Sequence, residues 1–234
     1  MKYTEYEKAL SAARLNKYLY ACSGNKKTAL QLYKLNIKLC QKMYGILNIF
    51  EIVLRNAIND HYKQFFSDPD WIMSQLPENG MLSTVPKKDE VVFLIRRLVN
   101  DGKYSSDRVV SSLSFGFWTH LFTKHPFNKG GKSILCIFPN KSKPLGQRAI
   151  FNELMRIKGF RNRIAHHEPI CFDITGRIDT SYTRENHMLI LRYLFFLGYE
   201  EAQILFGLDV QPIMILSKID DLANTNTPQH NILT

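Results

Sequence analysis

The sequence lacks any hydrophobic run long enough to cross a membrane. Its two best apolar stretches, 46–54 and 188–197, each contain a charged residue and fall short of about 18 residues. The N-terminus is charged and has no apolar segment of the kind found in secretory signal peptides. We therefore expect no membrane partner and a location in the cytoplasm.

Cysteine is scarce and unpatterned. The four cysteines form no C-x-x-C pair and have no histidine at zinc-ligand spacing: Cys22, Cys40, Cys136 and Cys171. Gly130-Gly131-Lys132-Ser133 resembles the end of a phosphate-binding loop, but Pro126 occupies the first glycine position and no strand precedes it. We expect free thiols in a reducing compartment, no metal site and no cofactor.

Strand signals are also few, whereas apolar residues recur at helical intervals of three and four along most of the chain. The sequence predicts an all-α fold in one domain over 1–223, with a flexible tail at 224–234. Long helices are expected within 4–66, an insert at 67–148, a helix at 150–167 and C-terminal helices at 182–223. The turn-like segment around Thr175-Gly176 could hold one small β-hairpin.

Acidic residues are absent from 108–152. Between 108 and 163 the chain carries 11 basic residues and one acid, Glu153, so this segment accounts for the net charge of +10. Such a zone is typical of proteins that bind a phosphate backbone, although it could also be a merely soluble basic surface. The candidate RNA contacts are Lys129, Lys132, Lys141, Lys143, Arg148, Arg156 and Lys158.

The basic zone leads into 153–170, a helical stretch that ends before Pro169. A residue that precedes proline is disfavoured in the α region, so we expect the helix to end near His167 or Glu168. At about 100° per residue, Asn162 and His166 share a face, and so do Arg163 and His167. The histidine pair could instead serve only as a C-terminal helix cap.

Arg161 lies about 140° from His166 and falls on the apolar face of the same helix. An inward arginine needs a carboxylate or a phosphate, because an unpaired buried charge is costly. A polar stripe on the long N-terminal helix, which includes Glu51 and Arg55, faces either solvent or a polar cleft. In the second case Glu51 is the natural partner of Arg161.

The segment Arg161-Asn-Arg-Ile-Ala-His166 matches the R-N-x-x-x-H form of the Arg-x4–6-His motif of HEPN-superfamily ribonucleases. The wider chain resembles the Abi-like, abortive-infection branch of that superfamily. The resemblance extends over most of the chain through Tyr18-Leu-Tyr-Ala-Cys22, Ala29-Leu-Gln-Leu-Tyr33, Glu51-Ile-Val-Leu-Arg-Asn-Ala57, Ser114-Phe-Gly-Phe-Trp118 and Arg161-Asn-Arg-Ile-Ala-His-His-Glu-Pro-Ile170.

The resemblance implies a HEPN-like helical bundle with additional helices and a metal-independent endoribonuclease, a toxin or phage-defence effector. In such enzymes the ribose 2′-OH attacks the adjacent phosphate and leaves a 2′,3′-cyclic phosphate. The implied catalytic residues are Arg161, Asn162, His166 and His167, and the supporting residues are Glu51, Arg55, Asn56 and Arg163. Implied partners are an RNA substrate, a second copy of the chain that completes the site, and a protein or RNA antitoxin.

Several alternatives stay open. His167 also fits the motif and could be the working base in place of His166. Arg55 and His61 form a second Arg-x5-His match, outside the segment that carries the charge excess. A non-catalytic RNA-binding or partner-binding protein would keep the basic zone. A metal hydrolase using His166, His167 and Glu168 would need a ligand spacing that the sequence does not show.

Overall fold

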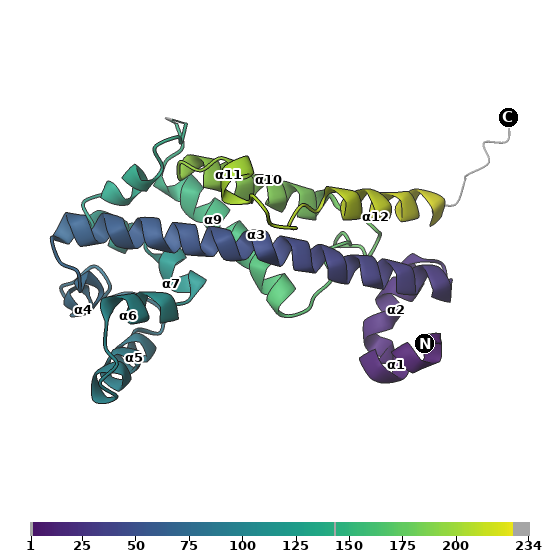
Figure 1. Cartoon of the computed structure of the whole chain (residues 1–234), viewed down its shortest axis with the longest axis horizontal. Coiled ribbons are helices and arrows are strands. Elements are labelled where there is room, and N and C mark those ends of the chain that lie inside the picture. Colours follow the sequence, from purple (N-terminus) through teal and green to yellow (C-terminus); the bar gives the residue numbers. More distant parts are fainter. Residues whose placement is uncertain (1, 143, 227–234) are drawn as a thin grey trace. The chain divides into compact units, whose positions relative to one another are not determined.

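The fold is all-α, as predicted, with 69% of the described residues helical. The computed structural model describes residues 2–142 and 144–226, and these form twelve α-helices and one 3-10 helix (Figure 1). Among the described residues, β pairing is limited to one isolated antiparallel bridge between Phe172 and Ile178. This bridge closes the turn at Thr175-Gly176, where a small hairpin was expected, so the hairpin amounts to a single bridge.

The chain divides into two compact units that are discontinuous in sequence. The first consists of Met1–Leu47, Phe160–Met188 and Gly207–Thr234, and the second of Asn48–Gly159 and Leu189–Phe206. Three helices contribute residues to both units: α3 (Lys26–Phe66), α9 (Gln147–Ala165) and α10 (Ser181–Phe196). Each unit is described by itself below, and the prediction of a single domain stays a prediction.

The first unit begins with α1 (Tyr3–Leu10) and α2 (Ala12–Ala21). The helix breaks at Ser11, whose φ of 74° is incompatible with α-helix, and the Ser11 hydroxyl accepts a hydrogen bond from the Arg14 amide. Tyr18 of α2 packs edge-on against Tyr33 of α3 and Phe172, with ring centroids 5.2 and 5.1 Å apart. The unit also contains α12 (Ile213–Asn226).

The second unit holds most of the shorter helices. They are α4 (Trp71–Gln75), α5 (Lys88–Asn100), α6 (Ser106–Ser112), α7 (Phe115–His120), α8 (Lys124–Lys129), the 3-10 helix η1 (Ser133–Ile137) and α11 (Glu201–Ile204). The aromatic residues of 115–122 are buried, and Phe50 of α3 packs edge-on against Phe115 and Tyr193. These aromatics therefore belong to the core and are not an RNA-stacking platform.

Helix α9 buries one face at the spacing expected from the sequence, with Ile150, Leu154, Ile157, Phe160 and Ile164 inside. The helix ends at Ala165, two residues before the predicted end. At the other end of the chain, α12 continues to Asn226. The rest of the tail predicted to be flexible, 227–234, lies outside the described residues. No helix in the described chain combines the length and apolar character that a membrane crossing requires.

Candidate functional site

The motif segment closes α9 with a hydrogen-bonded cap. The amide of His166 donates to the Asn162 carbonyl at 2.9 Å, that of His167 to Ile164 at 3.0 Å and that of Glu168 to Arg163 at 2.8 Å. His167 has φ 59°, so it occupies the left-handed position that glycine usually takes in a Schellman cap. The histidine pair therefore does form part of a C-terminal helix cap, and both imidazoles are exposed to solvent.

The cap separates the two histidines in direction. His166 keeps the helical bond to Asn162, so these residues lie one turn apart on the same side of α9. The left-handed backbone of His167 takes it off the helix, so the prediction that Arg163 and His167 share a face is wrong. Arg161 and Asn162 are both half-buried, one turn before the histidines.

Arg163 holds the turn that follows the helix. Its Nη2 donates to the Pro169 carbonyl at 2.7 Å, and its guanidinium lies 5.1 Å from the centroid of the Tyr182 ring. The Glu168 carboxylate lies 3.4 Å from Nε, which is an ion-pair contact without hydrogen-bond alignment. These contacts give Arg163 a supporting role in the geometry of the cap.

The next residue, Ile170, is fixed from both sides by buried polar groups. Its amide donates to Asn36 Oδ1 of α3 at 2.9 Å, and its carbonyl accepts from the Thr183 hydroxyl of α10 at 2.5 Å. Asn36 and Thr183 are only 2% and 0% exposed. Because buried peptide groups must be paired, these bonds set the path of the chain after Pro169.

The structure adds one residue that the sequence reasoning missed, Arg14 of α2. Its Nη1 donates a hydrogen bond of 2.9 Å to the main-chain oxygen of His167. A guanidinium carries five N–H donors, so Arg14 keeps further donors next to the main chain of His167. No pattern around Arg14 signals this role, because the contact depends on how α2 packs.

The predicted supporting residues Glu51, Arg55 and Asn56 lie on α3 in the second unit, whereas Arg161 belongs to the first. Pairing between Glu51 and Arg161 therefore stays a prediction. Within the second unit, Arg55 Nε donates to Asn56 Oδ1 at 3.2 Å. Asn59, at the end of the same polar stripe, is buried and accepts a hydrogen bond of 3.0 Å from the Trp71 indole.

The second Arg-x5-His match differs from the first because its histidine is half-buried. Arg55 and His61 are six residues apart on α3, which places them roughly 120° apart around the helix. His61 Nε2 lies 2.9 Å from the Ser133 hydroxyl, and burial lowers the pKa of the imidazole. His61 is thus part of the packing between α3 and η1.

Most of the basic residues predicted to contact RNA are exposed to solvent. Among the predicted RNA contacts, the exposed ones are Lys129, Lys132, Arg148 and Arg156. Lys141 and Lys158 are half-buried. The Lys158 side chain packs over Gly116, where an added Cβ would lie 3.1 Å from its Nζ. Lys143 lies outside the described residues.

Glu153, the one acid of this zone, is held by two neighbours on α10. Arg192 Nη2 donates to one of its carboxylate oxygens at 2.6 Å, and the Tyr193 hydroxyl donates to the other at 2.8 Å. Both carboxylate oxygens are therefore engaged inside the second unit.

The Gly130-Gly131-Lys132-Ser133 segment has a packing role. A Cβ at Gly130 would lie 2.7 Å from the Tyr62 hydroxyl, which explains the need for glycine. The Ser133 hydroxyl donates to the Gly130 carbonyl at 2.6 Å and also contacts His61.

In the part of the chain that the structure describes, no three histidine, cysteine, aspartate or glutamate side chains are grouped so that they could hold a metal ion. The four cysteines are free thiols. No protein-family model, no curated protein and no solved structure matches this chain. The resemblance to Abi-like proteins therefore depends on the sequence segments that carry it.

Proposed function

We propose that this protein is a metal-independent endoribonuclease that acts in the cytoplasm as a toxin or phage-defence effector. The observation that supports it best is the end of α9, where an exposed His166 lies one turn from Asn162. The turn that carries His166 is fixed by Arg14, Asn36 and Thr183. A general acid or base must be accessible and carried on a fixed backbone, and the exposed His166 on this hydrogen-bonded turn is suited to that role.

In the proposed reaction, one imidazole accepts the proton of the ribose 2′-OH while the 2′ oxygen attacks the adjacent phosphorus. The bond from phosphorus to the 5′ oxygen breaks, and a second imidazole protonates the departing 5′ oxygen. The products are a 2′,3′-cyclic phosphate and a 5′-OH. The Arg161 guanidinium and the Asn162 amide are suited to hydrogen-bond the phosphate as negative charge develops.

This chemistry needs two imidazoles and a guanidinium that converge on one phosphate. On a single α9, Arg161 and His166 point about 140° apart. We therefore propose a two-fold dimer in which each copy supplies part of each site. A protein or RNA antitoxin that neutralises the enzyme is a further expectation from the family resemblance.

The test is incubation of the purified protein with single-stranded RNA, with and without EDTA, followed by analysis of the product ends. The wild type should cleave RNA in both conditions and leave cyclic phosphate ends. His166→Ala and Arg161→Ala should each reduce cleavage at least 100-fold, as expected for removal of an acid–base group or a charge-stabilising donor. Lys8→Gln, an exposed change on α1, should cleave normally.

Cleavage that survives both alanine variants would reject the site, and inhibition by EDTA would favour a metal hydrolase. Analytical ultracentrifugation tests the dimer, because full activity from a monomer is incompatible with a composite site.

A second candidate is a non-catalytic RNA-binding protein. It is favoured by the fact that the cap itself accounts for His167 and for the contacts of Arg163. Recovery of intact RNA from a stable complex, under every cleavage condition tested, would establish this alternative.

A further inference from the structure

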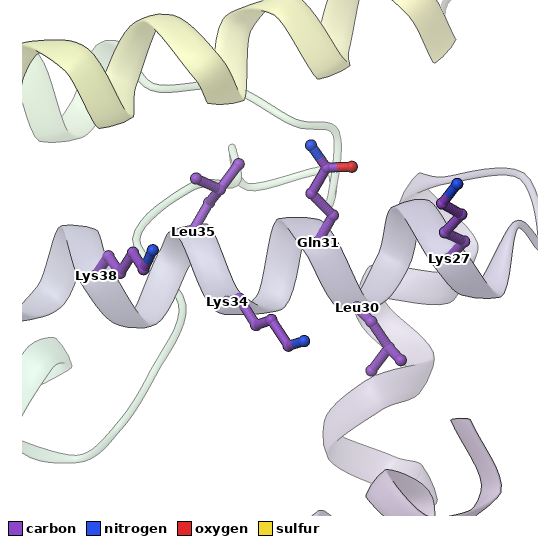
Figure 2. A pocket seen from close by; sticks show the side chains of 6 residues that line it. All are labelled: Lys27, Leu30, Gln31, Lys34, Leu35 and Lys38. Atoms are coloured by element: carbon purple, nitrogen blue, oxygen red, sulfur yellow. The ribbon is translucent and has the colours of Figure 1, made fainter. Parts of the chain in front are cut away.

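The first half of α3 concentrates positive charge that lies outside the basic zone of 108–163. Residues 26–50 contain five lysines and no aspartate or glutamate. Three of these lysines line a hollow of about 390 Å³ on the first unit, together with Leu30, Gln31 and Leu35. Figure 2 shows Leu35 and Gln31 on one side of the helix and Leu30 and Lys34 on the other.

Lys27, Lys34 and Lys38 follow one line along the helix. Their spacing of seven and four residues places them within roughly 40° of each other, opposite the buried face of Leu32, Asn36 and Met43. We call these three residues the α3 lysine row.

The α3 lysine row has no carboxylate partner among the described residues. Lys42, one turn further on, is different, because it pairs with Asp209. Lys34 is held 5.2 Å from the centroid of the Tyr6 ring of α1. Like charges on neighbouring turns repel each other, so a row of this kind is more stable with an anion bound.

We infer that the α3 lysine row binds the phosphate backbone of single-stranded RNA. The row spans about 16 Å at 1.5 Å per residue, which is long enough to lie along more than one phosphate of a single strand. An extended polyanion of regular charge spacing fits this row better than a compact anion. The half-buried Leu30 and Leu35 beside the lysines offer an apolar surface to bases, and Gln31 offers hydrogen bonds.

The same segment of α3 connects the row to the end of α9. Asn36 lies between Leu35 and Lys38 in sequence. On the opposite face of the helix, its side chain accepts a hydrogen bond from the Ile170 amide. RNA on the row would therefore lie about one helix diameter, 10–12 Å, from the turn that follows the histidines. The choice of RNA as ligand rests on the proposed function, whereas binding can be measured without cleavage.

The experiment measures binding of a fluorescent 2′-O-methyl RNA 20-mer at several salt concentrations, since this RNA has no free 2′-OH and cannot be cleaved by the proposed route. The variant is Lys27→Gln/Lys34→Gln/Lys38→Gln. Its matched control removes three exposed lysines elsewhere, Lys8→Gln/Lys103→Gln/Lys218→Gln, with the same loss of charge. Lys27→Gln/Lys38→Gln spares the Lys34 contact with Tyr6 and serves if the triple variant folds poorly.

The logarithm of the association constant for RNA falls linearly with the logarithm of the salt concentration, and each phosphate contact to a single strand makes this slope steeper by about 0.7. The triple variant should therefore lose about 2 from this slope, the double variant about 1.4, and the control much less. At 0.1 M salt the triple variant should bind 10-fold to 100-fold more weakly. Equal slopes in variant and control would overturn the inference. Polyglutamate serves as a second polyanion in the same assay. A triple variant that loses polyglutamate binding but keeps RNA binding would also overturn the inference.

A parallel assay with cleavable RNA separates the two proposals. A wild type that binds through the row but never cleaves would reject only the proposed function. Cleavage by the wild type, with the slope unchanged in the triple variant, would reject only the α3 lysine row.

Discussion

The guanidinium of Arg14 donates a 2.9 Å hydrogen bond to the main-chain oxygen of His167, a residue 153 positions further along the chain. This bond ties α2 to the cap of α9 and leaves further donors of Arg14 next to the main chain of His167. Arg14→Ala should reduce RNA cleavage about fivefold, because one charged hydrogen bond that steadies the turn is worth on the order of 1 kcal/mol at an exposed position.

Single-turnover cleavage measures this effect, and thermal melting checks the fold. Lys8→Gln removes a positive charge from the adjacent α1 and should retain wild-type rates. Equal rates for Arg14→Ala and the wild type would show that the contact has no part in the reaction.

The cap also offers a way to separate the two histidines. His167→Gly removes an imidazole and places at φ 59° the residue that adopts this conformation without steric cost. The free energy of unfolding should rise by about 0.5–1 kcal/mol, as measured by urea denaturation. If His166 is the base, cleavage should be retained in this stabilised variant.

His167→Ala is the matched comparison, since it removes the same ring but keeps a Cβ at a left-handed position. It should be no more stable than the wild type. Loss of cleavage in both variants would assign the base to His167, and a destabilised His167→Gly would contradict the cap geometry.

The bonds to Ile170 predict a stability effect that does not depend on the function. Thr183→Val leaves a buried carbonyl without its 2.5 Å donor, and Asn36→Leu leaves a buried amide without its acceptor. Each change should lower the free energy of unfolding by about 1–3 kcal/mol. Thr4→Val on the exposed surface of α1 should change it by less than about 0.5 kcal/mol.

Two half-buried histidines predict a loss of stability in mild acid. Burial lowers the pKa of His61, and burial followed by His125 and Lys158 lowers the pKa of His120, so the unfolded chain binds more protons than the folded one. The free energy of unfolding should therefore be highest above pH 7 and fall as the pH drops below about 6.5.

Urea denaturation between pH 8 and pH 5 measures this dependence. In the His61→Gln/His120→Gln variant, the free energy of unfolding should depend less on pH below pH 7. Near pH 8 its pH dependence should match that of the wild type. An unchanged slope in the double variant would assign the acid sensitivity to other groups.

The sequence predicted what depends on local periodicity. Ile150, Leu154, Ile157 and Ile164 repeat at helical spacing, and all four are buried on α9. Helix ends were less predictable, because the left-handed φ at His167 and at Ser11 sets them, and neither position is a glycine or proline. Arg14 could not be found at all, since only tertiary packing brings it to His167.

The three helices shared by the two units also bear on how the chain responds to proteases. The chain passes between the units inside α3, inside α9 and inside α10, where the backbone is in regular helix, and once more next to Gly207. Proteases cut extended, accessible backbone, so three of the four crossings resist nicking in the native state. A cut near Gly207 should therefore separate the segment that carries α12 from one large fragment, and neither unit should be released intact.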